Sequence, residues 1–233
     1  MAMHSRDRAG ELAGRRSSRT SRSLLGLLFA SGFIFTALDL TTSQVSAQEF
    51  ASLPETITNL HSIGGARPVP AWFDFCNRHP AECAVDTSEA DHITLTPEIW
   101  ATIVRINRAV NAEIRPVTDQ DQWGVVDSWD FPDTGYGDCE DYQLLKRRRL
   151  VDAGLPRRAL RMTVVLDELN EGHAVLKIRT DRGDLVLDNK RNAVLPWNKT
   201  GYVYIKREGH ESMTWVSLGG AVASPTAVAA TER

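Results

Sequence analysis

The sequence predicts an α+β fold in which helices come first and an antiparallel sheet follows. Between residues 70 and 156 apolar side chains recur at three- and four-residue spacing, which is typical of helices. Beyond residue 156 short β-rich runs alternate with turns, which is typical of antiparallel strands. The chain has 233 residues, of which 42% are hydrophobic and 24% charged, so it is long enough for one domain with a substantial core.

The first 47 residues have the pattern of a secretory signal peptide. A basic stretch with six arginines precedes an apolar run over residues 24–38 and the small residues Val45-Ser46-Ala47. The alternative is a membrane anchor, but spanning a bilayer takes about 20 apolar residues and this run is shorter. We therefore expect cleavage after Ala47, a single domain over residues 48–220, a disordered tail over residues 221–233, and a periplasmic or secreted location.

The charge of the chain argues against a nucleic-acid partner. The formal net charge is −3, and loss of the leader, with its six arginines and three acids, leaves −6. A mildly acidic chain lacks the basic surface that nucleic-acid binding requires. The histidines have no ligand-like spacing, so zinc is not predicted either.

The three cysteines predict one local disulfide and one free thiol. Cys76 and Cys83 lie seven residues apart, whereas Cys139 is distant from both. In an oxidising compartment the near pair is expected to form a bridge, worth about 2–3 kcal/mol in the chain-entropy model. The alternative is three reduced, buried cysteines. An unpaired thiol in an exported protein is a candidate reactive group.

The clearest predicted helix begins at Thr96-Pro97-Glu98. Threonine can cap a helix, proline suits its first position, and glutamate favours the positive end of its dipole. Its apolar face consists of Ile99, Trp100, Ile103, Ile106, Val110 and Ile114. Four polar residues are expected mostly on the other face: Arg105, Asn107, Arg108 and Asn111. Pro116 ends the helix.

An aspartate-rich loop over residues 117–137 leads to a second helix. A structureless loop of this length inside a domain is often functional. Its Trp123 and Trp129 could line a substrate groove or pack against the next helix. That helix begins near Cys139, with acids in its first turn and the basic run Lys146–Arg149 near its end, as the helix dipole favours. We interpret the basic run as a solvated helix end, followed by a stop at Gly154.

Five strands are predicted after Pro156. They cover residues 162–166, 173–179, 185–188, 202–206 and 213–217. The second and third form a hairpin that turns at residues 181–184. A turn centred near residues 180–181 places His173 opposite Asp188 at the open end of the hairpin.

Three side chains in these elements could carry out covalent catalysis. Cys139 lies at a helix start, where free N–H groups and the dipole favour a thiolate and could hold an oxyanion. A nucleophile of this kind needs a base, and the base needs a third group that orients it. His173 and Asp188 suit these two roles. The structural alternative is a packed cysteine and a structural histidine, which spacing alone does not exclude.

Three blocks of the sequence resemble the bacterial transglutaminase-like cysteine proteinase family. They are Gly137-Asp138-Cys139-Glu140-Asp141-Tyr142, Gly172-His173-Ala174-Val175-Leu176 and Gly183-Asp184-Leu185-Val186-Leu187-Asp188-Asn189. The resemblance extends to residues 72–76 and 200–202 and covers nearly all of the chain after the leader. It implies a papain-like or transglutaminase-like fold, with the nucleophile's helix packed on an antiparallel sheet. It also implies a cysteine peptidase whose Cys-His-Asp triad falls on Cys139, His173 and Asp188.

The resemblance further implies a cofactor and partners. The best-understood members are calcium-dependent periplasmic proteases that cut large surface adhesins, release biofilms and are restrained by an inner-membrane receptor. Calcium would then be held by Asp138, Glu140 and Asp141, because hard oxygen ligands suit this ion. The alternative is that these acids cap the helix and compensate its dipole without a metal.

Two other functions stay open at the level of sequence. The same triad supports acyl transfer to an amine, as in a transglutaminase or amidase. A non-catalytic, calcium-responsive binding module could also keep this scaffold, although the intact set of cysteine, histidine and aspartate argues against it.

Overall fold

The computed structural model describes residues 52–220, so the predicted leader and tail lie outside the described part. The helices come first, as predicted. They are α2 (Pro70–Arg78), α3 (Pro80–Cys83), α4 (Pro97–Glu113), α5 (Asp119–Trp123) and α6 (Cys139–Asp152). The main strands follow: β4 (Leu160–Leu166), β5 (Gly172–Thr180), β6 (Gly183–Leu187), β7 (Leu195–Pro196), β8 (Val203–Glu208) and β9 (Trp215–Ser217). Single 3-10 turns cover Arg157–Ala159 (η1) and Trp197–Lys199 (η2).

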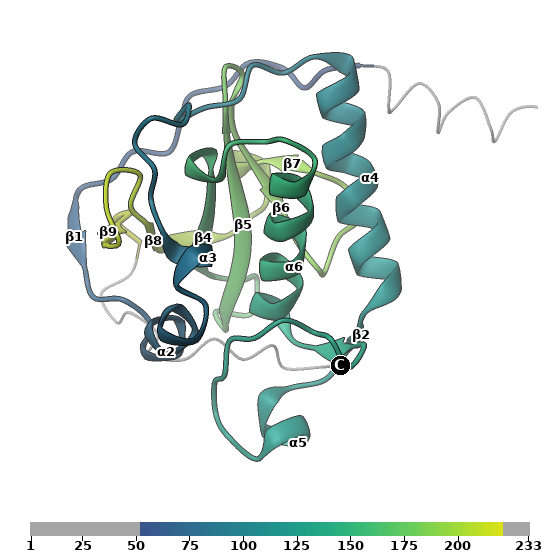
Figure 1. Ribbon diagram of the computed structural model, residues 1–233. Helices are drawn as coiled ribbons and strands as arrows, with labels where there is room; N and C mark the ends of the chain where they lie inside the picture. Colours follow the sequence, from purple (N-terminus) through teal and green to yellow (C-terminus); the bar gives the residue numbers. More distant parts are fainter. Residues whose placement is uncertain (1–51, 221–233) are drawn as a thin grey trace, which may run out of the picture. The chain divides into compact units, whose positions relative to one another are not determined.

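These strands form one sheet with a helical layer on one face. The order is β1-β9-β8-β4-β5-β6-β7, with β1 (Gly64–Ala66) added at one edge, and every pairing is antiparallel. Helix α6 packs on β5 and β4, and α4 packs on α6, as Figure 1 shows. The α+β prediction, with the nucleophile's helix on an antiparallel sheet, is therefore confirmed.

The two faces of the sheet bury two different clusters. The face toward the helices includes Ala174, Leu176 and Ile178 of β5 within the main core. The other face carries Val165, Val175, Val186, Tyr202, Tyr204 and Leu218. Because successive strand residues point to opposite faces, His173 belongs to the face of Val175, whereas Ala174 points toward α6.

Helix α4 begins as predicted, but one polar residue that the sequence places on its outer face is buried. Thr96 Oγ1 accepts a hydrogen bond from Ile99 N at 3.3 Å, and Pro97 is the first helical residue. Asn107, which we expected mostly on the outer face, is completely buried. Its Nδ2 donates to the main-chain oxygens of Arg191 and Asn192. The buried amide is tolerated because a neighbouring loop supplies its acceptors.

Helix α6 starts at Cys139 and ends before Gly154, which has a positive φ of 89°. Only half of the basic run near its end is partly exposed, so our interpretation of a solvated helix end holds for Arg148 and Arg149 but is wrong for the first two residues. Lys146 and Arg147 are buried, and Arg147 Nη1 donates to both carboxylate oxygens of Glu208 at 3.0 and 2.7 Å. Strand β8 thus supplies a counter-charge that the sequence pattern of α6 does not reveal.

The predicted hairpin is present, but its register differs by two residues. Leu176 pairs with Leu187 and Thr180 pairs with Gly183, so the loop contains only residues 181 and 182. Gly183 permits this tight turn because its φ is +101°, and a Cβ there would lie 2.5 Å from the Ile57 side chain. Asp188 therefore follows the last residue of β6 instead of pairing directly with His173.

Of the remaining predictions, the disulfide is confirmed and the structureless loop is wrong. Cys76 and Cys83 form the predicted disulfide, with Cα atoms 5.6 Å apart, and Cys139 is free. The loop over residues 117–137 is not structureless: it contains α5 and β3 (Tyr136–Gly137), which pairs with β2 (Arg115–Pro116). Within residues 52–220, no helix combines the length and apolarity needed to cross a membrane.

Candidate active site

The sulfur of Cys139 is buried between the start of α6 and strand β5. Cys139 is the first residue of α6 and has no exposed surface. Its Sγ lies 3.1 Å from Glu140 Oε2, and it accepts a hydrogen bond from Ala174 N at 3.3 Å. The helix start therefore brings the thiol against β5 one residue beyond His173.

His173 and Asp188 form a buried pair at the end of the hairpin. His173 Nε2 lies 2.9 Å from Asp188 Oδ1, which also accepts a hydrogen bond from Lys190 N at 3.0 Å. Burial alone would raise the pKa of Asp188, but the hydrogen bond and charge of His173 and the hydroxyl of Tyr202 lower it to about 2. An ionised carboxylate only accepts, so Nε2 carries a proton and the Nδ1 of a neutral ring is unprotonated.

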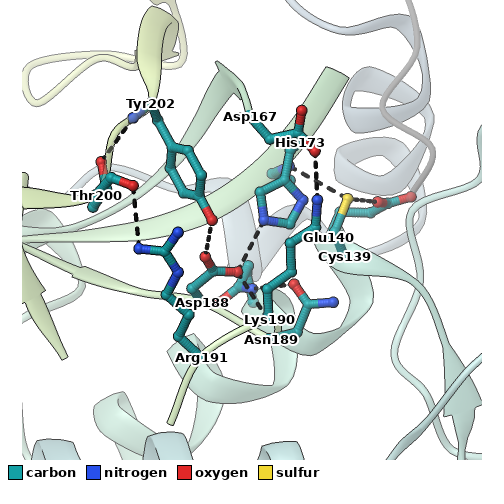
Figure 2. Close-up of polar contacts among 12 residues, drawn as sticks. Cys139, Glu140, Asp167, His173, Asp188, Asn189, Lys190, Arg191, Thr200 and Tyr202 are labelled. Atoms are coloured by element: carbon teal, nitrogen blue, oxygen red, sulfur yellow. Dashed lines mark hydrogen bonds and ion pairs between the residues drawn. The ribbon is translucent and has the colours of Figure 1, made fainter. Parts of the chain in front are cut away.

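The imidazole and the thiol are neighbours without a direct hydrogen bond. His173 Nδ1 is buried and has no hydrogen-bond partner among residues 52–220. In the view of Figure 2 the ring lies between the Asp188 carboxylate and the sulfur of Cys139. Strand alternation explains the gap, because Ala174 rather than His173 points toward α6, so the sulfur meets β5 at its main chain.

The electrostatics around the thiol differ from the expectation of a thiolate. Burial, and then the negative charge of Asp138, raise the pKa of the Cys139 thiol above its usual value. The helix N-terminus favours the opposite direction, but acids surround it. In this state Cys139 is a neutral thiol that donates to Glu140.

Five acids gather around the start of α6. Carboxylate oxygens of Asp119, Asp127 and Glu140 lie within 4.8 Å of one another, as do those of Asp119, Asp138 and Asp141. Gly137 makes room for this arrangement, since a Cβ there would lie 2.7 Å from Asp141 Oδ2. The three predicted metal ligands are therefore brought together, and two further acids from the 117–137 loop join them.

Within this cluster acids lie against other acids, although the charge of Lys206 acts on Asp127. Asp138 Oδ1 and Glu140 Oε1 are buried without a hydrogen-bond partner within residues 52–220. Burial raises the pKa of Asp138 to about 7, and burial together with neighbouring negative charge raises the pKa values of Glu140 and Asp141. Asp138 makes no side-chain capping bond at α6, which weakens the capping alternative.

The acids also fold the loop that precedes α6. Asp119 accepts a hydrogen bond from Ser128 N, and Asp130 N donates to Asp141 Oδ1 at 2.9 Å. Trp129 is buried and packs edge-on against Trp215, which supports packing for this residue, whereas Trp123 is 56% exposed. The sequence marks this loop as rich in aspartate, but it does not show which aspartates reach the nucleophile.

Two contacts on Asp188 were not predicted. Tyr202 donates its hydroxyl to Asp188 Oδ2 at 2.5 Å, and Asn111 Nδ2 donates to the Asp188 main-chain oxygen at 2.9 Å. Tyr202 belongs to a block that carries the family resemblance, which is the one signal that could have drawn attention to it. Nothing in the sequence distinguishes Asn111 from other polar residues of α4.

The motif blocks and this geometry agree with a comparison to known families. The family described as bacterial transglutaminase-like cysteine proteinases matches residues 63–222. The chain belongs to this family. The protein is accordingly a member of a cysteine peptidase family, with a transglutaminase-like α+β fold.

Solved structures of LapG from Legionella pneumophila are similar to this transglutaminase-like proteinase. One shares 26% identity over 52% of this chain and 70% of that chain, with a TM-score of 0.45. The EGTA-treated form shares 27% over 48% and 64%, with a TM-score of 0.43. The calcium-bound form shares 22% over 55% and 83%, with a TM-score of 0.42. No curated protein matches the chain closely enough to count as a relative.

Proposed function

We propose that this proteinase is an endopeptidase in which Cys139 is the nucleophile, His173 the base and Asp188 the residue that orients the base. The observation that carries the proposal is the 2.9 Å contact from His173 Nε2 to Asp188 Oδ1. It leaves Nδ1 as a buried acceptor without a hydrogen-bond partner among residues 52–220. A nucleophile, a base and an orienting carboxylate in this order are the parts that covalent peptide hydrolysis requires.

The reaction then follows from these groups. His173 Nδ1 takes the thiol proton, and Cys139 Sγ attacks the scissile carbonyl carbon to form a tetrahedral intermediate. The oxyanion lies near the backbone N–H of Cys139, which at the first helical position has no partner within the helix. The imidazolium returns its proton to the leaving amine as the C–N bond breaks. Water, deprotonated by the imidazole, then cleaves the thioester and releases the acid.

Two rearrangements precede attack in this proposal. Cys139 and His173 are both completely buried, so a peptide reaches the sulfur only after covering atoms have moved. The thiol also has to turn from Glu140 Oε2, its present acceptor, toward His173 Nδ1. In this proposal, the arrangement with both residues buried is the resting state of the enzyme.

We further propose calcium as the cofactor, with Asp138, Glu140 and Asp141 as ligands and with Asp119 and Asp127 completing the set. The fit rests on oxygens that are buried without partners among the described residues and on carboxylates whose pKa values are raised. All five donors are hard oxygens, as calcium prefers. When bound, the ion would supply positive charge next to the nucleophile. Glu140, as one of the ligands, would then no longer accept the hydrogen bond of the thiol.

The physiological setting is proposed on the basis of the family resemblance. We infer an exported enzyme that processes a large surface adhesin in the periplasm and is restrained there by an inner-membrane receptor. The Cys76–Cys83 disulfide is consistent with an oxidising compartment.

The test compares the host's surface proteins in cells that carry the wild-type chain or Cys139→Ala. We expect one or a few large proteins to lose their processing in the variant, and His173→Gln and Asp188→Asn to behave alike. Incubation of the purified enzyme with the affected protein and an added amine then separates hydrolysis from acyl transfer. An unchanged set of surface proteins, together with no cleavage in vitro, would refute the endopeptidase.

A further inference from the structure

Tyr202 contacts both members of the His173–Asp188 pair. It lies immediately before β8, and its hydroxyl donates to Asp188 Oδ2 at 2.5 Å. Its ring meets the His173 ring edge-on, with centroids 5.7 Å apart and planes at 76°. Figure 2 shows the phenol reaching the carboxylate on the side away from the imidazole.

The two oxygens of Asp188 therefore have separate tasks. Oδ1 faces His173 Nε2 and Lys190 N, whereas Oδ2 has the Tyr202 hydroxyl. Without the bond to Oδ2, the two hydrogen bonds to Oδ1 alone would allow the carboxylate to rotate about its Cβ–Cγ bond. We propose that Tyr202 is a positioning residue, which fixes the carboxylate rotation and the ring plane that His173 needs to act as a base.

Tyr202 is itself held by the turn that precedes it. Its N–H donates to Thr200 Oγ1 at 3.2 Å, and Thr200 Oγ1 donates in turn to Trp197 O at 2.9 Å. Arg191 lies over the Tyr202 ring at 5.5 Å and bonds Thr200 O at 3.2 Å. A side chain braced in this way can transmit orientation to a neighbour instead of adapting to it.

The phenol is also a dependable donor. Burial, and then the negative charge of Asp188, raise the pKa of Tyr202 above its usual value, so it stays protonated at neutral pH. The same hydrogen bond favours the ionised form of Asp188.

Tyr204, two residues further along and within β8, provides a matched control. It is buried like Tyr202, and its hydroxyl contacts Thr200 Oγ1 at 3.0 Å and Trp197 O at 3.1 Å. Among residues 52–220 that hydroxyl has no bond to Asp188. Tyr202→Phe and Tyr204→Phe thus remove the same atom at similar burial, but one of them touches the His173–Asp188 pair.

The proposal rests on the proposed function, so one of its two measurements does not depend on catalysis. The first is ¹⁵N NMR of the His173 ring in histidine-labelled full-length protein, with His173→Gln to assign the signal. We expect a single Nε2–H tautomer in the wild type and in Tyr204→Phe, and a mixture of tautomers in Tyr202→Phe. The second is the rate of Cys139 alkylation by iodoacetamide at pH 7.

We expect alkylation to be about tenfold slower in Tyr202→Phe and within about twofold of the wild type in Tyr204→Phe. An unchanged tautomer in Tyr202→Phe would overturn the positioning role. Equal effects of both substitutions would overturn it too, because they would indicate a non-specific loss of packing around the site. A shifted tautomer in a protein that cleaves no peptide would support the positioning role and refute the endopeptidase instead.

Discussion

Helix α6 carries two buried charge clusters, and they are built in opposite ways. Near its C-terminal half, Glu208 is bonded by Arg147, by Trp72 Nε1 at 2.6 Å and by Met162 N at 2.9 Å. Burial alone would raise the pKa of Glu208, but Arg147 and Arg161 lower it. At the N-terminal end, acids face other acids and their pKa values are raised. The first cluster pairs its acid with opposite charge among the described residues, whereas the second places acids against acids, and it is there that we propose calcium.

From this difference we propose that the first cluster maintains the fold and that the second serves the catalytic site. A compensated ion pair in the core can be strongly stabilising relative to its broken form. Uncompensated acids destabilise the fold, and proteins keep such groups at functional sites. Removing a charge should therefore have opposite effects at the two ends of one helix.

The largest expected effect is at the compensated end. Arg147→Ala leaves Glu208 buried without its main partner and should lower the free energy of unfolding by about 3–5 kcal/mol. The control is Arg149→Ala, which breaks the partly exposed pair with Glu113 and should cost less than about 1 kcal/mol. Urea denaturation measures both. Equal losses would mean that the burial of Glu208 does not set the cost.

The second effect is at the acidic end. Calcium at one hundred times its dissociation constant should stabilise the wild type by about 2.7 kcal/mol, seen as a higher Tm. Glu140→Gln should remove most of this response, because Glu140 Oε1 is one of the oxygens without a partner among residues 52–220. In EDTA the same variant should be at least as stable as the wild type. A Tm that does not respond to calcium in the wild type would remove the cofactor from the proposal.

A third effect concerns Lys146, which lies between the two clusters. Its Nζ is buried with no hydrogen-bond partner among residues 52–220. Burial lowers the pKa of Lys146 to about 7, partly opposed by the charge of Asp188. Since the unfolded chain then binds more protons between about pH 7 and pH 10.4, the cost of burying this lysine falls, and the stability of the fold rises, as pH rises through this window.

Lys146→Met should abolish that dependence. The difference in unfolding free energy between the wild type and Lys146→Met should shift in favour of the wild type by about 1–2 kcal/mol from pH 7 to pH 9. Urea titrations at several pH values measure it. A difference that does not change with pH would show that the ammonium is solvated or paired.

The sequence predicts the local parts of this site and misses the parts that depend on topology. Cys139 at a helix start, His173 and Asp188 at a hairpin end and the Cys76–Cys83 disulfide all follow from short motifs. The bond from Arg147 to Glu208 spans 61 residues, and the bond from Asn111 to Asp188 spans 77. A helical pattern does not reveal which strand will compensate its charge, so Arg147 was misread as solvated. The hairpin register failed for a related reason, because one glycine shortened the turn.

The smallest effect compares two helix starts. Thr96 Oγ1 caps α4 through Ile99 N, so Thr96→Ala should cost about 1 kcal/mol. Asp138 is the equivalent residue of α6, but its side chain makes no capping bond and instead accepts from Asp119 N at 3.3 Å. Asp138→Asn keeps that acceptor and removes a charge from the acid cluster. We expect its stability in EDTA to equal or slightly exceed that of the wild type, and its calcium response to fall. A loss as large as that of Thr96→Ala would mean that Asp138 stabilises the start of the helix. The clusters at the two ends of α6 would then both have a structural role and would differ mainly in the sign of their charge.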